Sequence, residues 1–334
     1  MKTLVLGHDQ VKKLLSMKEC IDAIEAMFKA LAAGKAVLPL RQVVFKPDRK
    51  GALGSMPSYL GEPEAFGSKV ITYFAGNTNT KFDSHQGAVL LFETENGRLL
   101  GIMDASSITS IRTAAASGVA TRLLARKGAT TLAILGSGTE AATHLEAMAS
   151  VRDLEKVRIW SRTMDNARRF VERHSSAYPS LEFKAVASVR EAVSDADIVC
   201  TTTSSTEPVL AGEWLKLGTH VNAVGASIPS ARELDSEAVL RSALYVDRRE
   251  SALTEAGDFL IPKTEGLIDD SHIKGEIGEV LCGKIKGRVS EDEITLFKSL
   301  GIATEDVAAA HLLYTKAVSQ GLGTWIEFSA EREL

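Results

Sequence analysis

Residues 130–141 combine an apolar run rich in strand formers with the pattern Gly-x-Gly-x-x-Ala, and a helical pattern follows from Ala142 to Ala149. Gly136 permits a tight turn, Gly138 lets the backbone approach a pyrophosphate, and Ala141 is small enough for close helix–strand packing. The N-terminus of the helix would face the phosphates. The stretch therefore predicts a dinucleotide-binding turn. An ordinary strand-to-helix turn is the plain alternative, because an isolated motif of this kind is weak evidence.

Beyond residue 130 the chain alternates between strand-like and helix-like segments. The expected strands cover 130–135, 156–161, 182–187, 197–202, 219–224 and 243–247. The expected helices cover 140–150, 164–175, 188–194, 235–241, 249–256, 276–286 and 291–299. Such alternation requires right-handed crossovers and gives a mostly parallel sheet. We therefore expect a doubly wound α/β domain of six strands, with the glycine loop after its first strand.

The first 128 residues indicate a different architecture. Helical periodicity covers 9–34. Strand-like stretches follow at 41–45, 51–58, 67–74, 87–92 and 98–103. The pair Asn96-Gly97 separates the last two stretches and indicates a hairpin with a two-residue primed turn. We expect an antiparallel sheet with helices on one side.

Two long helices are expected outside these segments. One covers 104–127, with Asp104 as its N-cap, and its apolar residues recur every three or four positions, which predicts a single apolar face. The other covers 304–320, because the carboxylates of Glu305 and Asp306 favour a helix start. The C-terminal segment is expected to return to the first domain.

Composition excludes several classes of protein. A net charge of -4 and a pI of about 6.0 give no basic surface for nucleic acid or an anionic membrane. No apolar run reaches the length of about 18 residues that a transmembrane helix needs. No histidine pair or acidic cluster indicates a metal site. The cysteines Cys20, Cys200 and Cys282 lie far apart in apolar contexts, so we interpret all three as buried and expect a reducing cytoplasm.

The residues at the end of the second predicted α/β strand bear on the choice of dinucleotide. A carboxylate there would bond the ribose 2′-hydroxyl of NAD, whereas an arginine would accept the 2′-phosphate of NADP. The sequence has Ser161-Arg162-Thr163 and no carboxylate, which favours NADP(H). The plain alternative is that Ser161 or Thr163 caps the next helix and Arg162 is solvated. Thr201–Thr203 and Val224–Ser227, at later strand ends, offer further polar groups or simply reflect strand propensity.

Three basic residues interrupt apolar patterns before residue 113. Arg41 opens a strand, Lys69 lies within another, and Arg112 lies on the small-residue helix. Each alone is most simply a solvated charge. Together they would converge on a small carboxylate, which arginine binds in bidentate fashion, and a lysine with a lowered pKa would bond or protonate the reacting group. His85 is by default a structural histidine and, more weakly, a further cation for a dicarboxylic substrate.

These motifs together resemble the ornithine cyclodeaminase/mu-crystallin family. The resemblance rests on Arg41, Gly54-Ser55-Met56-Pro57, Lys69, His85-Gln86-Gly87, 100–104, 108–115, the glycine loop, 222–226, 232–235, 297–301 and Glu305-Asp306. It implies an NAD(P)-dependent homodimer. It also implies a Rossmann domain, 113–301, inserted into an α+β substrate-binding and dimerisation domain, 1–112 with 302–334.

The resemblance, added to the motifs, assigns the site residues. Lys69 and Arg112 are the expected catalytic residues. The expected substrate contacts are Arg41, Met56, Lys69, Arg112 and Ser227. The expected cofactor contacts are His85, Thr113, Gly136, Ser137, Gly138, Thr139, Ala141, Ser161, Arg162, Thr163, Thr202, Val224, Ser227, Ser299 and Leu300.

Ser227 is the departure that separates two activities of the family. The cyclodeaminases carry an aspartate at this position, and a hydroxyl cannot replace a carboxylate base at neutral pH. The resemblance therefore implies reduction of a small 2-imino acid to an amino acid, with NADP(H) favoured and NAD(H) as the alternative. The imine is either cyclic or formed from a 2-oxo acid and ammonia or an amine. Two other functions stay open: a cyclodeaminase-type lyase that recycles NAD, and a low-turnover protein that binds NADPH and a ligand.

Overall fold

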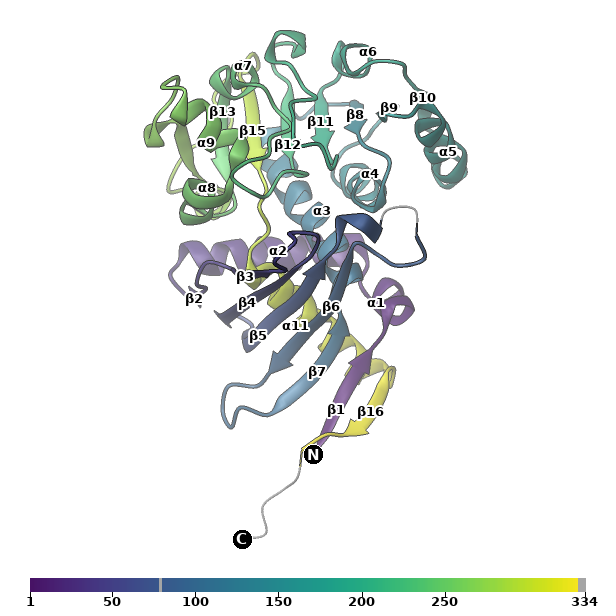
Figure 1. Cartoon of the computed structure of the whole chain (residues 1–334), viewed down its shortest axis with the longest axis vertical. Coiled ribbons are helices and arrows are strands. Elements are labelled where there is room, and N and C mark those ends of the chain that lie inside the picture. Colours follow the sequence, from purple (N-terminus) through teal and green to yellow (C-terminus); the bar gives the residue numbers. More distant parts are fainter. Residues whose placement is uncertain (78–79, 330–334) are drawn as a thin grey trace. The chain divides into compact units, whose positions relative to one another are not determined.

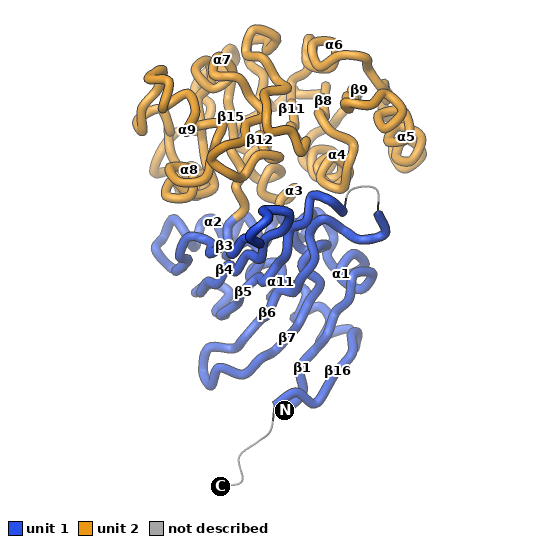
Figure 2. Tube along the Cα trace, viewed as in Figure 1, with its two compact units in different colours: residues 1–112, 302–334 blue, residues 113–301 orange. Residues whose placement is uncertain are grey.

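The computed structural model describes residues 1–77 and 80–329, so the last residues of the predicted first domain, 330–334, lie outside the described part. The chain forms two compact units, residues 1–112 with 302–334 and residues 113–301 (Figure 2). Helix α3 (Ala105–Leu124) carries the chain from the first unit into the second.

The first unit contains a mainly antiparallel sheet (Figure 1). Its strands are β1 (Lys2–Leu6), β2 (Ala36–Val37), β3 (Gln42–Phe45), β4 (Ala52–Gly61), β5 (Glu64–Tyr73), β6 (His85–Phe92), β7 (Leu99–Asp104) and β16 (Thr324–Glu327). They run in the order β16-β1-β7-β6-β5-β4-β2, and β3 pairs with β4. β1 and β7 pair in parallel, whereas the other pairs are antiparallel. The antiparallel sheet predicted for this part of the chain is confirmed.

The helices of the first unit are α1 (His8–Leu14), α2 (Met17–Ala32) and α11 (Ala303–Gln320). The predicted helical stretch 9–34 is thus confirmed, but it is two helices. Ile21, Ile24 and Phe28 are fully buried on α2, as their helical spacing predicts. Helix α11 packs against α2 and against strands β4 and β5.

Strand alternation places Lys69 on the inner face of β5. Ala65, Gly67 and Lys69 are buried, whereas Phe66 between them is exposed. Gly67 is required there, because a Cβ atom would lie 2.5 Å from Cγ2 of Val307 on α11. Helix α11 therefore crosses β5 at close range, on the face that carries the lysine.

The hairpin between β6 and β7 is confirmed, but its predicted two-residue primed turn is wrong. Residues 93–98 separate the strands, and the Glu93 carboxylate accepts three backbone N–H bonds within this loop. Gly97 has a φ of 72°, but Asn96 has no positive φ, and a type I′ turn requires positive φ at both positions. A side-chain acceptor organises the loop in place of the tight turn.

The second unit is a doubly wound sheet with helices between its strands. Its strands are β8 (Thr131–Leu135), β9 (Lys156–Trp160), β10 (Glu182–Ala185), β11 (Ile198–Thr201), β12 (His220–Ala223), β13 (Ser242–Val246), β14 (Ile273–Glu276) and β15 (Ile294–Lys298). Its other helices are α4 (Thr139–Val151), α5 (Met164–His174), α6 (Val189–Val193), α7 (Ser236–Leu240), α8 (Arg249–Glu255), α9 (Gly257–Thr264) and α10 (Ile277–Leu281).

All pairs in this sheet are parallel, and the order is β10-β9-β8-β11-β12-β15-β13-β14. The chain moves outward from β8 in one direction and then returns to β11 on the other side. The glycine loop after β8 stands at this switch point, which is where doubly wound folds bind their ligands. The predicted α/β fold class is confirmed.

The predicted helix at 291–299 is wrong, because this segment contains strand β15 between β12 and β13. All five of its residues are buried. A short apolar run has no resolved period, so periodicity alone does not distinguish a buried strand from a buried helix turn. With β14 added, the sheet has eight strands where six were predicted.

Helix α3 confirms its predicted N-cap and contradicts its predicted single apolar face. Asp104 Oδ2 accepts the backbone N–H of Ser107 at 2.8 Å. Every residue from 110 to 121 is buried, so the helix is buried on all sides over this stretch. Its many alanines and serines permit this burial, and the apolar spacing is not the deciding signal.

Two of the three cysteines are buried as predicted, but Cys282 is exposed. It lies at the end of α10, where the short helix gives way to a turn. None of the helices within residues 1–77 and 80–329 is long and apolar enough to cross a membrane.

Candidate active site

The first unit contains a buried cluster of two cations and two carboxylates, which we call the Lys69 cluster: Lys69, Arg112, Glu305 and Asp306. Lys69 Nζ lies 2.9 Å from Asp306 Oδ2 and donates to Thr109 Oγ1 at 3.3 Å. Arg112 Nε donates to Asp306 Oδ1 at 2.9 Å, and its terminal nitrogen donates to Glu305 Oε2 at 2.6 Å. The first turn of α11 thus holds a lysine from β5 and an arginine from α3.

The Lys69 cluster is withdrawn from solvent. The side chains of Lys69 and Arg112 are 3% and 4% exposed, and those of Glu305 and Asp306 are 0% exposed. Burial and the charge of Arg112 lower the pKa of Lys69 to about 8, although Asp306 opposes this shift. An ammonium group with such a pKa can release a proton near neutral pH, so Lys69 can act as an acid or a base.

Three further predicted residues belong to the surroundings of Lys69. Met56 on β4 is buried and is the direct cross-strand partner of Lys69. Arg41 immediately precedes β3 and lies close enough for its charge to lower the pKa of Lys69. The His85 ring contacts the Tyr73 ring in a tilted arrangement, with 4.8 Å between centroids, and desolvation together with the charges of Lys69 and Arg112 lowers the pKa of His85. The first unit therefore gathers five of the predicted residues.

In the second unit, the glycine loop has the geometry that its sequence predicts. Gly136 has a φ of 132°, and a Cβ atom there would lie 2.5 Å from Thr202 Oγ1, so only glycine fits. Gly138 is the N-cap residue of α4, and a Cβ there would meet no described atom within 4 Å. Ala141 is fully buried on the first turn of α4. The loop leaves the helix N-terminus open to an anion.

The polar groups around this loop come from two strand ends. The Ser137 hydroxyl donates to Ser161 Oγ at 3.0 Å, which joins the ends of β8 and β9. Arg162 and Thr163 follow and are exposed, as is Thr139 at the start of α4. Thr163 occupies the N-cap position of α5, but its side chain makes no capping hydrogen bond. The alternative that the Thr163 side chain caps this helix is therefore wrong.

The remaining predicted cofactor residues lie at or near the ends of other strands, except Thr113, which is buried on α3. Thr202 follows β11, and its N–H donates to the carbonyl of Leu135 at 2.8 Å. Val224 and Ser227 follow β12. Ser299 and Leu300 follow β15 and are buried.

These residues fit a dinucleotide. The open helix N-terminus and the glycine turn suit a pyrophosphate, and the paired hydroxyls of Ser137 and Ser161 suit a ribose or its phosphate. The hydroxyl of Ser299 is buried and has no hydrogen-bond partner among the described residues, so it is available to a bound group. Within the described ranges, no group of His, Cys, Asp or Glu side chains is arranged to hold a metal ion.

Sequence reasoning missed the carboxylates of the Lys69 cluster. It used Glu305 and Asp306 as a helix-start signal, and both do lie in the first turn of α11. Nothing local indicates that they are counter-ions, because Asp306 lies 237 positions from Lys69 in the sequence. The available signal was that acidic residues adjoin an otherwise apolar helix.

The comparisons agree with this architecture. Residues 1–321 match the sequence profile of the ornithine cyclodeaminase/mu-crystallin family. Ketimine reductase mu-crystallin of Mus musculus is 42% identical over 294 residues, which cover 88% of this chain and 90% of that protein. The chain therefore belongs to the ornithine cyclodeaminase/mu-crystallin family, as its motifs predict.

Solved structures extend the similarity to the whole fold. The Delta(1)-pyrroline-2-carboxylate reductase of Thermococcus litoralis, in complex with NADH and L-proline, is 43% identical. It has a TM-score of 0.94 and covers 96% of this chain and 99% of its own. An archaeal alanine dehydrogenase dimer with bound NAD is 35% identical, with a TM-score of 0.92, over 98% of this chain and 100% of its own.

Proposed function

We propose that this protein is an NAD(P)H-dependent oxidoreductase that reduces a small 2-imino acid to an amino acid. The observation that carries the proposal is the buried Lys69 cluster, which presents a guanidinium and a lysine of lowered pKa on adjacent elements. Its relatives include a ketimine reductase and a pyrroline-2-carboxylate reductase. A carboxylate next to an imine is a substrate that this charge pattern suits.

The residues of the first unit divide the work. Arg112, with Arg41, holds the substrate carboxylate and fixes the plane of the imine. Lys69 Nζ donates a proton to the imine nitrogen, which a pKa of about 8 permits at neutral pH. The nicotinamide, when bound, supplies the hydride that the imine carbon accepts. One hydride and one proton convert the C=N bond to an amine, and the chain contributes position and charge.

We further propose that the second unit holds the dinucleotide and prefers NADPH. The pyrophosphate lies at Gly136, Gly138 and the start of α4 in this proposal. Arg162, exposed at the end of β9, meets the 2′-phosphate together with Ser161. The relatives with NADH and NAD bound show that the fold also accepts the cofactor without this phosphate.

A homodimer completes the proposal. Strands β3, β4 and β5 expose large apolar side chains: Val43 41%, Val44 68%, Phe45 48%, Leu53 44%, Phe66 47% and Tyr73 43%. Val44 and Leu53 are direct cross-strand partners, so part of this surface is contiguous. The alanine dehydrogenase relative is a dimer. Sedimentation should give twice the chain mass of 35.8 kDa, and a single-chain mass would refute the dimer.

The decisive assay follows NADPH and NADH oxidation with cyclic 2-imino acids, iminosuccinate, and 2-oxo acids mixed with ammonia or methylamine. Oxidation with at least one of these imines supports the proposal. Ammonia release from ornithine with catalytic NAD would instead indicate a cyclodeaminase, which Ser227 argues against. Cofactor binding without oxidation across the whole panel would indicate a binding protein.

A further inference from the structure

We propose that Glu233 is a positioning residue, which fixes the two strand-end loops that carry Thr202 and Ser227. The proposal rests on the proposed function, because it assigns these loops to the cofactor side of an imine reductase. Glu233 lies between β12 and α7 and is 0% exposed. It does not itself belong to the predicted cofactor or substrate contacts.

The carboxylate of Glu233 accepts four hydrogen bonds from two loops. Its Oε1 atom accepts the backbone N–H of Thr203 at 2.6 Å and the Thr203 hydroxyl at 2.7 Å. Its Oε2 atom accepts the Thr201 hydroxyl at 2.7 Å and the backbone N–H of Gly225 at 2.6 Å. One side chain therefore ties the loop after β11 to the loop after β12.

A second pair of charges secures Glu233 and the next residue of the loop. Asp258 Oδ1 accepts the backbone N–H groups of Glu233 at 2.8 Å and Leu234 at 3.0 Å. Lys298 Nζ lies 2.9 Å from Asp258 Oδ2 and donates to the carbonyl of Ala226 at 2.5 Å. We call Glu233, Asp258 and Lys298 the Glu233 network. Its Glu233 binds the N–H of Gly225 and its Lys298 binds the carbonyl of Ala226, so the network fixes the two residues that precede Ser227.

Two glycines allow close backbone packing around this loop. A Cβ atom on Gly225 would lie 2.1 Å from the carbonyl oxygen of Thr203 and 2.6 Å from Glu233 Oε1. A Cβ on Gly257 would lie 2.0 Å from the carbonyl oxygen of Ala231, at the far end of the same loop. The glycines let the backbone reach the carboxylate, and the carboxylate then fixes the backbone.

A glutamine cannot replace Glu233 in this role. One of its two terminal atoms is a donor, so it would face the backbone N–H of either Thr203 or Gly225. A hydroxyl can rotate to become an acceptor, but a backbone N–H cannot. Glu233→Gln must therefore release one of the two loops, although it keeps the size of the side chain. A displacement of about 1 Å in a supporting loop is enough to cost about 100-fold in rate.

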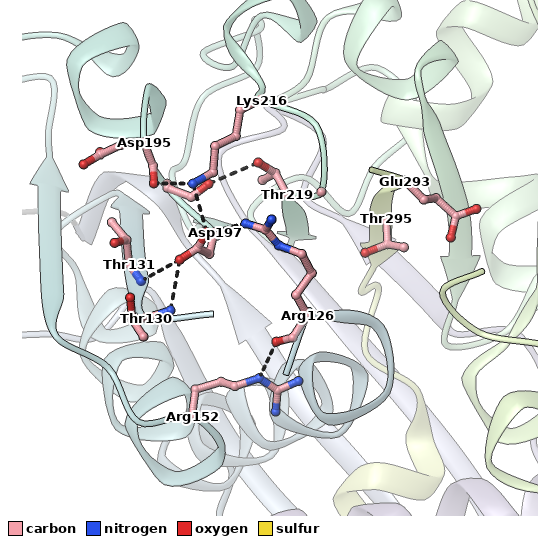
Figure 3. A network of polar contacts seen from close by, with 12 residues as sticks. Arg126, Thr130, Thr131, Arg152, Asp195, Asp197, Lys216, Thr219, Glu293 and Thr295 are labelled. Atoms are coloured by element: carbon pink, nitrogen blue, oxygen red, sulfur yellow. Dashed lines mark hydrogen bonds and ion pairs between the residues drawn. The ribbon is translucent and has the colours of Figure 1, made fainter. Parts of the chain in front are cut away.

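The amino-terminal ends of the strands in the same sheet offer a matched control (Figure 3). Asp197, which precedes β11, accepts the backbone N–H groups of Thr130 at 2.9 Å and Thr131 at 3.0 Å. It also accepts from Arg126 at 2.6 Å and Lys216 at 2.9 Å. We call these groups the Asp197 network. Asp197 and Glu233 are both buried carboxylates that join neighbouring segments at β11. Only Glu233 lies at the carboxyl ends of the strands, where such folds bind ligands.

The test compares Glu233→Gln with Asp197→Asn in the full chain. Hydrogen–deuterium exchange of residues 225–231, the affinity for NADPH by fluorescence, and kcat and KM with an imine substrate are measured for both. We expect Glu233→Gln to lower kcat by about 10- to 100-fold, with a smaller change in KM, and to speed exchange in 225–231. Asp197→Asn should lower Tm but keep kcat within about twofold and leave that exchange unchanged.

Wild-type exchange in 225–231 for Glu233→Gln, or an equal loss of kcat in both variants, would overturn the positioning role. If Glu233→Gln does not fold, Thr201→Val removes one of the four bonds without opposing two donors. It should lower kcat by about threefold, and unchanged kcat and exchange would overturn the proposal. If the wild-type protein fails to oxidise NADPH with any of the imines, the proposed function is refuted instead. The exchange and the NADPH affinity of the variants then still decide the role of Glu233.

Discussion

The Lys69 cluster and the Asp197 network both join a lysine and an arginine to carboxylate oxygens, yet they differ in solvation. The Lys69 and Arg112 side chains are 3% and 4% exposed, and Asp306 binds both of them. Arg126 and Lys216 are 28% and 34% exposed, and Asp197 also binds two backbone N–H groups. The first cluster withdraws its cations from water, whereas the second leaves its cations partly exposed to solvent.

This difference separates a chemical role from a structural one. Burying a cation is costly, and buried charges with perturbed pKa values gather at functional sites. Burial accordingly lowers the pKa of Lys69 to about 8, so its proton is transferable. Burial opposes ionisation of Asp197 as well, but the bonds from Lys216 and from the backbone outweigh it and lower the pKa of Asp197. That carboxylate stays charged and joins the start of β11 to the start of β8.

Of the replacements considered, that of Arg112 should reduce activity most strongly. Arg112→Ala removes the proposed bidentate partner of the substrate carboxylate, and two charge-assisted bonds correspond to a loss of at least about 100-fold in kcat/KM. Steady-state kinetics with an imine substrate measures the effect. Arg112→Lys keeps the charge without the planar fork and should recover only part of the loss. A kcat/KM of wild-type size in Arg112→Ala would exclude Arg112 from substrate binding.

Removing the counter-ion of Lys69 should have the next largest effect. Lys69 faces the charges of Arg112, Arg41 and Asp306, and only Asp306 raises its pKa. Asp306→Asn should therefore lower the pKa of Lys69 further and reduce kcat by about tenfold.

The pH profile gives the sign of that effect. Protonated Lys69 is the proposed acid, so kcat should fall as pH rises through its pKa, near 8 in the wild-type protein. In Asp306→Asn this alkaline limb should move to lower pH. A limb that stays in place, or moves to higher pH, would show that Lys69 is not the group that titrates.

Arg162 tests whether a solvent-exposed cation can still take part in cofactor binding. Arg162 is exposed, as the cations of the Asp197 network partly are, but it stands at the ligand-binding edge of the sheet. Arg162→Ala should raise KM for NADPH by about tenfold and leave KM for NADH nearly unchanged. Equal changes for the two cofactors would remove Arg162 from phosphate recognition, and Arg168, exposed on the following helix, provides a control replacement.

The smallest effect on activity is expected at Asp197. Asp197→Asn should lower the free energy of unfolding by about 1–3 kcal/mol at pH 7 and leave kcat nearly unchanged. Because the pKa of Asp197 is lowered on folding, its stabilisation is complete above the unfolded pKa of about 4 and is lost as pH falls through the folded pKa. Urea unfolding at neutral and acidic pH should therefore show the variant and the wild type converging in acid. A constant difference would assign the stabilisation to packing.

The sequence predicted the parts of the fold whose signals are local. The strand, glycine turn and helix at 130–141 have local signals: Gly136 has a φ of 132° and no space for a Cβ atom, and Ala141 is fully buried on the first turn of α4. β15 was missed because a buried segment of five residues shows no clear period, and its place between β12 and β13 is decided by long-range pairing. The turn at 93–98 was missed because a carboxylate organises it.

The same limit applies to the site. Arg41, Lys69 and Arg112 were identifiable because a charge inside an apolar pattern needs a reason. The carboxylate partners of Lys69 and Arg112 lie on a helix near the other end of the chain, so no sequence spacing joins them. Glu233 was visible only as part of a motif, and its four bonds depend on how two loops fold around it.

Isotopic labelling follows the hydride from the nicotinamide to the imine carbon. The protein is mixed with NADPH carrying deuterium at both C4 positions and with a cyclic 2-imino acid, and the product is analysed by mass spectrometry. The expected product is an amino acid that carries one deuterium, bound to the α-carbon. An amino acid without deuterium, or unchanged imine beside bound NADPH, would contradict transfer of hydride to the imine carbon.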